Sequence, residues 1–303
     1  MNRRHDIDAL RALAFGLVIL YHVAMYYVAG WHWHLKSPHA AEWLQWPMRA
    51  VNLWRMDLVF LISGLSLALL CRAARPGAGL LAQRSWRLLL PLAFGMAAIV
   101  PYQAYAQAVA NGAVQPGFGD FLLRYFTGGP WPRHAFDGAH VGVTWNHLWY
   151  LAYLWVYTAA ALALQPLLRS PAGRRVQVAF TGLRGLRFAL LPVVPLLLYS
   201  LLLWPHFPPT RDLVGDGWLH AVYFTLFLYG YWIGVDAGWW AEAARLRKPM
   251  LAAALLLLPL AMTARGWAGP QAARLLADLY LWAALLAILG WARVMLDRPW
   301  PWL

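Results

Sequence analysis

Long apolar stretches recur along the chain, and short polar or basic segments separate them. Crossing a hydrocarbon core of about 30 Å takes about 20 residues of α-helix, and about eight stretches approach or exceed that length. The pattern therefore predicts an all-α, polytopic transmembrane bundle. The expected spans are residues 8–30, 51–71, 88–109, 146–166, 188–204, 218–239, 250–265 and 272–294.

The composition supports this prediction. Of the 303 residues, 62% are hydrophobic and only 12% are charged. A soluble protein cannot bury that much apolar surface in one core, whereas an integral membrane protein needs it against lipid. The net charge of +13 would suggest a nucleic-acid partner in a soluble domain. Basic cytoplasmic loops explain it better here, so membrane lipid is the expected partner and nucleic acid is not.

The distribution of basic residues predicts the orientation. With the N-terminus in the cytoplasm, sixteen of the 25 Lys and Arg fall in cytoplasmic segments and eight in outer ones, leaving Arg11 aside. This excess is the one expected of cytoplasmic loops, so both termini are predicted to be cytoplasmic. The histidines have the opposite bias, because all except His5 fall in the outer half or outside. Imidazole exchanges protons near neutral pH, so we look for chemistry in the outer half.

The first apolar stretch carries two groups that are costly in a membrane. Arg11 and His22 are eleven residues apart, which on a helix places them within about 20° of one face and about 16 Å apart. Ionisable side chains inside a span favour a functional role. Two alternatives stay open: His22 can be a packing histidine, and Arg11 can reach the inner surface and pair with Asp8 one turn earlier.

Further polar groups lie at the predicted outer surface. His32, His34 and His39 invite a metal site, but without nearby carboxylates or thiols the pattern is weak, and no metal is expected. The Gly- and Pro-rich loop 110–145 is predicted to be a lid or a re-entrant cover. It ends in Asn146-His147, a polar pair at the outer mouth of the fourth span.

The second span holds a second pair of charges. Arg55 and Asp57 are too close in sequence to face each other on a helix, so each is expected to find a partner elsewhere in the bundle. Ser63 and Gly64 allow close helix approach, and packing is the favoured interpretation for them.

Two arginines precede the third span. Arg84 and Arg87 are three residues apart, so they share one helix face at the cytoplasmic surface. Guanidinium groups in that arrangement can grip phosphate oxygens. The equally favoured alternative is a pair of charges that only sets the topology.

These motifs together resemble the acyltransferase-3 family of integral membrane proteins, and within it the branch of periplasmic-glucan succinyltransferases. The opening segment is similar to the family's first-helix motif of a basic residue, a ten-residue gap and a histidine. Further blocks follow in family order along the whole chain. The blocks are Asp6–Arg11 with His22, Trp54-Arg55, Phe60–Gly64, Arg84-X-X-Arg87 leading to Pro91, Val100–Gln103 and His147–Trp149.

The resemblance implies a bacterial inner-membrane, multi-pass enzyme. Its acyl-CoA donor, acetyl-CoA or succinyl-CoA, would enter from the cytoplasm as a substrate, with no permanently bound cofactor, and its acceptor would be a periplasmic or cell-surface glycan. His22 would be the catalytic base, and Arg11, Arg84 and Arg87 would bind acyl-CoA. The remaining polar candidates, on the acceptor side or structural, are Asp8, Arg55, Asp57, Asn146 and His147.

The chain also departs from the family pattern. Residues 1–303 are expected to form a single domain that lacks the family's C-terminal helices, because residues 298–303 read as a loop before a further span. A truncated or partner-dependent, non-catalytic membrane protein is therefore one alternative. A glycan or lipid transporter is another, although the two internally related halves typical of transporters are not apparent.

Overall fold

A computed structural model describes residues 4–73, 78–234 and 236–298. The regular secondary structure of the described residues is helical, apart from one isolated bridge between Val28 and Ala41, and loops connect the helices. The all-α prediction is confirmed. The α-helices are α1 (His5–Tyr27), α2 (Gln45–Asn52), α3 (Arg55–Ala73), α4 (Ala78–Phe94), α5 (Val100–Ala110), α6 (Phe118–Phe126), α7 (Trp149–Ala163), α8 (Gln165–Leu168), α9 (Pro171–Thr181), α10 (Gly185–Leu190), α11 (Val194–Leu202), α12 (Gly217–Ile233), α13 (Ala237–Trp267) and α14 (Gly269–Met295), and the short elements are η1 (Glu42–Leu44), η2 (Gly95–Ile99), η3 (Asn146–Leu148) and η4 (Leu191–Val193).

Six helical segments within the described residues are long and apolar enough to cross a membrane. They are His5–Tyr27, Glu42–Arg72, Gly79–Ala110, Gly185–Leu202, Ala237–Trp267 and Gly269–Met295. The other two predicted spans correspond to α7 and α12, which have 15 and 17 residues. At 1.5 Å per residue these helices are about 22 and 25 Å long, somewhat less than a hydrocarbon core. The chain is thus a multi-pass membrane protein, and the span number of eight stays a prediction, as do the positions of the termini.

The chain divides into two compact units. The first comprises Met1–Tyr21, Trp46–Pro76 and Ala160–Leu303, and the second comprises His22–Gln45 and Gly77–Ala159. Helix α1 therefore contributes its first part to the first unit and its last residues, from His22, to the second. The predicted C-terminal loop falls largely on residues 299–303, which lie outside the described residues.

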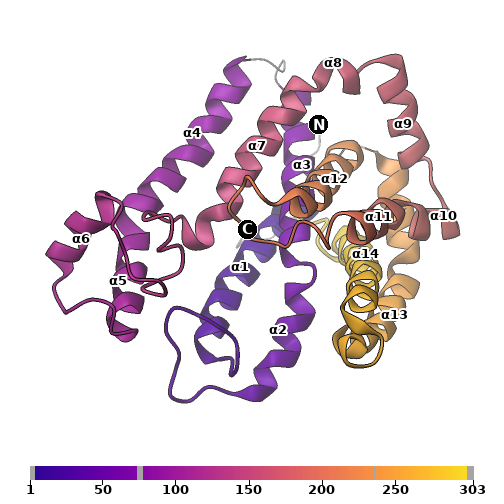
Figure 1. Cartoon of the computed structure of the whole chain (residues 1–303). Coiled ribbons are helices and arrows are strands. Elements are labelled where there is room, and N and C mark those ends of the chain that lie inside the picture. The colour runs from indigo at the N-terminus through magenta and orange to yellow at the C-terminus, as the bar shows by residue number, and fades with distance from the viewer. Residues whose placement is uncertain (1–3, 74–77, 235, 299–303) are drawn as a thin grey trace. The chain divides into compact units, whose positions relative to one another are not determined.

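Glycines bring the helices of the first unit into close contact. A Cβ at Gly64 of α3 would overlap the carbonyl oxygen of Phe227 in α12, and one at Gly230 would overlap that of Leu61. The neighbouring Ser63 donates its hydroxyl to the Val59 carbonyl of its own helix, 2.7 Å away. Figure 1 shows α13 and α14 side by side along much of their length. Small residues at such contacts are how helices gain packing in lipid, as predicted for Gly64.

Gly64→Ala is therefore expected to destabilise the first unit. The added methyl group meets helix backbone rather than a flexible side chain, and such overpacking costs about 1–3 kcal/mol. The measurement is the temperature at which the detergent-solubilised protein loses its monodisperse chromatographic peak. Gly266→Ala in α13 is the matched control, because a Cβ there meets no atom within 4 Å. Equal transition temperatures for the two variants would contradict the close-packing role of Gly64.

In the second unit, α4, η2 and α5 form one continuous helical segment. The π-helical turn η2 and the prolines Pro91 and Pro101 lie near its middle, where they locally disturb the regular hydrogen-bond ladder. Arg84 and Arg87 lie near its start, and Gln103 and Gln107 near its end. Because sixteen residues separate Arg87 from Gln103, these side chains are about 24 Å apart along the helix.

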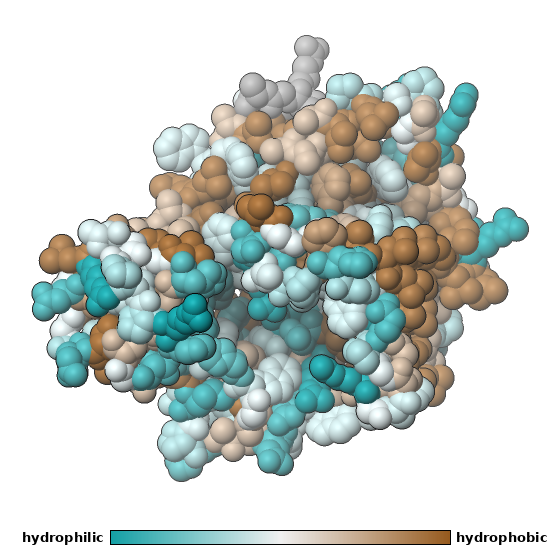
Figure 2. Space-filling view, viewed as in Figure 1, coloured by the Kyte–Doolittle hydropathy of each residue, from teal (hydrophilic) through white to brown (hydrophobic). Residues whose placement is uncertain are grey.

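Apolar side chains are exposed on the surfaces of the spans. Figure 2 shows apolar surface over the region of α10 and α11, where Leu186, Leu198 and Leu202 are exposed. Such contiguous apolar exposure is unusual for a soluble monomer but is what a lipid-facing surface requires. The surface of the protein is therefore consistent with the membrane environment that the composition predicts.

Candidate active site

His22 and the two aromatic rings recorded beside it, those of Trp33 and His147, belong to the second unit. His22 is half-buried near the end of α1. Its ring centroid lies 5.6 Å from that of Trp33 and 5.6 Å from that of His147, which approaches with an interplanar angle of 61°. The fold thus places two imidazoles beside each other although they are far apart in sequence. His22 comes from the predicted first span, and His147 comes from the predicted outer mouth of the fourth span.

The short element η3 is held in place by contacts on both sides of His147. Asn146 adopts a left-handed backbone conformation with φ of 50°, which Asn tolerates better than most residues. Its side-chain Nδ2 donates to Gln103 Oε1 at 3.2 Å. Leu148 packs against Gly95 so closely that a Cβ there would overlap it. These contacts anchor η3, and with it His147, to the continuous α4–α5 segment.

The loop after α1 is tied to the end of that helix. The Lys36 ammonium donates to the carbonyl oxygens of Met25, at 2.7 Å, and Val28, which uses carbonyls that a helix C-terminus leaves unpaired. Burial lowers the pKa of Lys36. The backbone N–H of Ser37 also donates to the Tyr26 carbonyl at 2.9 Å. The loop that carries Trp33 is therefore held against the helix that carries His22.

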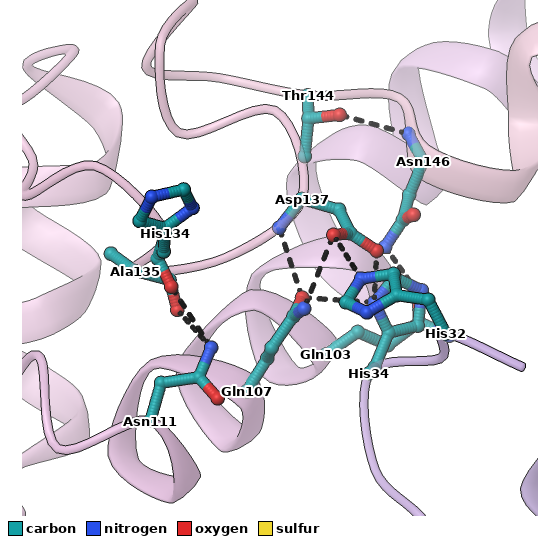
Figure 3. A network of polar contacts seen from close by, with 10 residues as sticks. All are labelled: His32, His34, Gln103, Gln107, Asn111, His134, Ala135, Asp137, Thr144 and Asn146. Carbon is teal, nitrogen blue, oxygen red and sulfur yellow. Dashed lines mark hydrogen bonds and ion pairs between the residues drawn. The ribbon is translucent and has the colours of Figure 1, made fainter. Parts of the chain in front are cut away.

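Asp137 is the centre of a polar network that joins this loop to the loop before α7 (Figure 3). Its carboxylate lies 2.9 Å from His32 Nε2 and 3.1 Å from His34 Nδ1. Gln107 of α5 bonds Asp137 twice: its Nε2 donates to Asp137 Oδ1 at 3.2 Å, and its Oε1 accepts from the Asp137 backbone N–H at 2.9 Å. Burial alone would raise the pKa of Asp137, but the hydrogen bonds of His34 and His32 outweigh it and hold that pKa well below its ordinary value.

Sequence reasoning did not find Asp137 or Gln107. The metal hypothesis singled out His32 and His34, but their carboxylate partner lies about a hundred residues further on, in a segment without regular structure. No local spacing connects such residues. Among the described residues, no group of three or more His, Cys, Asp or Glu is arranged to hold a metal ion.

The predicted lid, residues 110–145, has an aromatic core of its own. Phe121 and Tyr125 of α6 pack with Phe136 and with Ala104 and Ala108 of α5. The Tyr125 hydroxyl accepts from the Thr144 backbone N–H at 3.1 Å. The segment is therefore packed onto the end of α5, and this packing places Asp137 beside Gln107.

Arg84 and Arg87 lie on α4, in the same unit as His22. Arg84 is half-buried and Arg87 is exposed, and their spacing places both on one face of the helix. Trp155 of α7 donates its indole N–H to Ser85 Oγ at 2.8 Å, which fixes α7 against this part of α4. The two guanidinium groups and the cluster around Gln103 and Gln107 thus lie toward opposite ends of one helical segment.

The other predicted site residues lie in the first unit. Arg11 is exposed, and its Nη2 lies 3.5 Å from Asp8 Oδ1, which is the pairing that the spacing allows. Arg55 lies over the ring of Tyr21, with 3.3 Å between the guanidinium carbon and the ring centroid. Asp57 is buried and close enough to Arg274 of α14 to interact electrostatically. The charged pair of the second span therefore has its neighbours on other helices.

Comparison with models of protein families places the chain in a known family. A family model described as an acyltransferase domain, Acyl_transf_3, matches residues 4–303 and so extends over both units. No curated protein matches the chain, and no solved structure does.

Proposed function

The chain belongs to the Acyl_transf_3 family of acyltransferases, and on that premise we propose that it is a membrane O-acyltransferase with His22 as general base. It would move an acyl group from cytoplasmic acyl-CoA to a hydroxyl group of a periplasmic or cell-surface glycan. The observation that carries the proposal is the half-buried His22–His147 pair, within the unit that also holds Arg84 and Arg87.

In the proposed reaction, His22 removes the proton from the acceptor hydroxyl as its oxygen attacks the thioester carbonyl. A carbon–oxygen bond forms, the carbon–sulfur bond breaks, and the proton passes to the departing thiolate to give free CoA. His147 lies beside His22 and so stands next to the imidazolium that forms. No side chain of the enzyme is consumed, and His22 returns to its starting protonation state.

The donor would be held by its phosphates at the opposite end of α4–α5. Guanidinium groups bind phosphate oxygens in a bidentate way. Arg84 and Arg87 share one face of the helix, and both lie about 24 Å or somewhat more from Gln103 along its axis. That length approaches the hydrocarbon thickness of about 30 Å, so donor and acceptor could bind near opposite membrane surfaces. The resemblance makes Arg11, eleven residues before His22 on α1, a further candidate for binding acyl-CoA.

Arg84→Ala and Arg87→Ala are each expected to raise the KM for acyl-CoA by about tenfold or more, because a charge-assisted hydrogen bond contributes about 1.5–3 kcal/mol. The measurement is the initial rate of transfer against donor concentration. Arg174→Ala, which removes an exposed arginine of α9, is the control and should leave the KM unchanged. A lower kcat at unchanged KM in the Arg84 and Arg87 variants would contradict phosphate binding.

For the acyl group and the location, the proposal relies on the resemblance alone. The similarity to glucan succinyltransferases favours succinyl, with acetyl as the second candidate, and a bacterial inner membrane as the site of action. Membranes that contain the chain can be offered labelled succinyl-CoA or acetyl-CoA on either face, with a glucose trisaccharide as acceptor. Transfer that requires donor on the cytoplasmic face supports the proposal. An inserted protein that transfers neither label to any acceptor contradicts it and favours a non-catalytic or transport protein.

A further inference from the structure

His34 differs from the other histidines of the site in how it is buried and bonded. Only 7% of its side chain is exposed. Its Nδ1 has two neighbours, Gln107 Oε1 at 2.9 Å and Asp137 Oδ2 at 3.1 Å. Its other ring nitrogen, Nε2, is buried and has no hydrogen-bond partner among the described residues. A buried polar atom without a partner is uncommon and calls for a reason.

The network fixes which nitrogen of His34 carries the proton. The backbone N–H of Asp137 can only donate, so the Gln107 atom that it contacts must be the acceptor Oε1. Both neighbours of His34 Nδ1 are therefore acceptors, a carboxylate and an amide oxygen. Nδ1 must therefore carry a proton, and in the tautomer with that single ring proton Nε2 is a lone-pair acceptor. The aspartate and the glutamine thus prepare an imidazole that can receive a hydrogen bond.

The surroundings of His34 connect this acceptor to the reaction centre. The Trp33 ring lies 4.6 Å from the His34 ring and 5.6 Å from the His22 ring. His34 is also close enough to His147 to interact electrostatically with it. Half-buried Trp33 offers an aromatic face to an apolar or sugar-ring surface. One loop therefore places a half-buried aromatic ring and the buried His34 Nε2 near the proposed base.

We propose that His34 Nε2 binds a second hydroxyl group of a polyhydroxylated acceptor, while His22 acts on the hydroxyl that is acylated. The inference rests on the proposed acyl transfer and assigns its acceptor-binding part. His34 selects and orients the acceptor, and Asp137 and Gln107 act through His34 by holding its tautomer. An acceptor with a single hydroxyl group lacks the group that this site binds.

The test uses membranes that contain the full chain and a glucose trisaccharide as the acceptor, at saturating labelled donor. His34→Ala should raise the KM for the trisaccharide by about ten- to a hundredfold, since a buried hydrogen bond to the substrate is lost. The kcat should change by less than about threefold, because the reacting groups are untouched. His34→Gln, whose amide oxygen can accept a hydrogen bond, should recover part of the affinity.

The matched control is His32→Ala. His32 contacts the same carboxylate at 2.9 Å, but it is exposed, so its loss should leave the KM within about threefold of the unaltered value. Asp137→Asn should weaken trisaccharide binding, because an amide can donate to Nδ1 and turn Nε2 into a donor. An unchanged KM in His34→Ala, or an equal increase in His32→Ala, would overturn the inference.

Monodeoxy trisaccharides separate this inference from the proposed function. One deoxy form, the one that lacks the hydroxyl group bound by His34, should bind the unaltered protein about tenfold or more weakly than the parent trisaccharide does. The same deoxy form and the parent trisaccharide should bind the His34→Ala variant equally well. Losses that are the same in both proteins for every deoxy form would exclude a hydroxyl contact at His34 while leaving acyl transfer intact. If His22→Ala transfers label as well as the unaltered chain, the proposed function itself fails.

Discussion

Replacing His22 by alanine is expected to lower the rate of acyl transfer by about 10²–10⁴-fold, the usual contribution of a general base. No other group replaces it directly in the proposed reaction, because His147 lies 5.6 Å away between ring centroids and is held by η3. The rate is measured with labelled donor and the trisaccharide, in membranes that contain equal amounts of protein. The loss should appear in kcat rather than in the KM for the donor.

Two controls distinguish lost chemistry from lost structure. His140→Ala removes an exposed histidine of the same unit and should leave the rate within about twofold. His22 is only half-buried, so His22→Ala should keep the chromatographic profile of the unaltered protein in detergent. If His22→Ala is as active as His140→Ala, His22 is not the base and is a packing histidine instead.

The helices were largely predictable because lipid demands long apolar segments. The ends of the helices were less predictable. The predicted span 146–166 is a helix only from Trp149 to Ala163, and Pro166 opens a separate turn, α8, as expected where proline disfavours a continuing helix. The predicted span 250–265 is the second half of α13, which begins at Ala237. Its charged first half carries no hydropathy pattern that would reveal it.

The site was predictable where its residues interact locally or are costly in a membrane. Arg11 and Asp8 are three residues apart, and His22 stands out in an apolar stretch. His34 and Asp137 interact only because two irregular loops meet at Gln107. Nothing in one sequence indicates that encounter, since the loop conformations depend on the aromatic core around Phe121 and Tyr125.

Replacing Arg274 by methionine is expected to produce the largest loss of stability in the first unit. Arg274 Nη2 lies 2.6 Å from Asp278 Oδ1, and the Asp278 side chain has no exposed surface. Removing one partner of a buried ion pair leaves an uncompensated charge and costs about 3–5 kcal/mol. The measurement is the temperature at which the detergent-solubilised protein loses its monodisperse peak. Arg265→Met, at an exposed arginine of α13, is the control and should have little effect.

The double variant Arg274→Met with Asp278→Leu shows why the single variant Arg274→Met is less stable. If the unpaired carboxylate is the cause, removing it as well should recover most of the lost stability, because apolar pairs replace buried ion pairs at little cost. If the loss comes from the Arg274 contact with the Trp218 ring, 5.1 Å from the guanidinium carbon, the double variant stays as unstable as the single one. Asp57 interacts electrostatically with both Arg274 and Asp278, so the double variant removes one attractive and one repulsive neighbour of Asp57. Any difference in stability that remains between the double variant and the unaltered protein includes this coupling to Asp57.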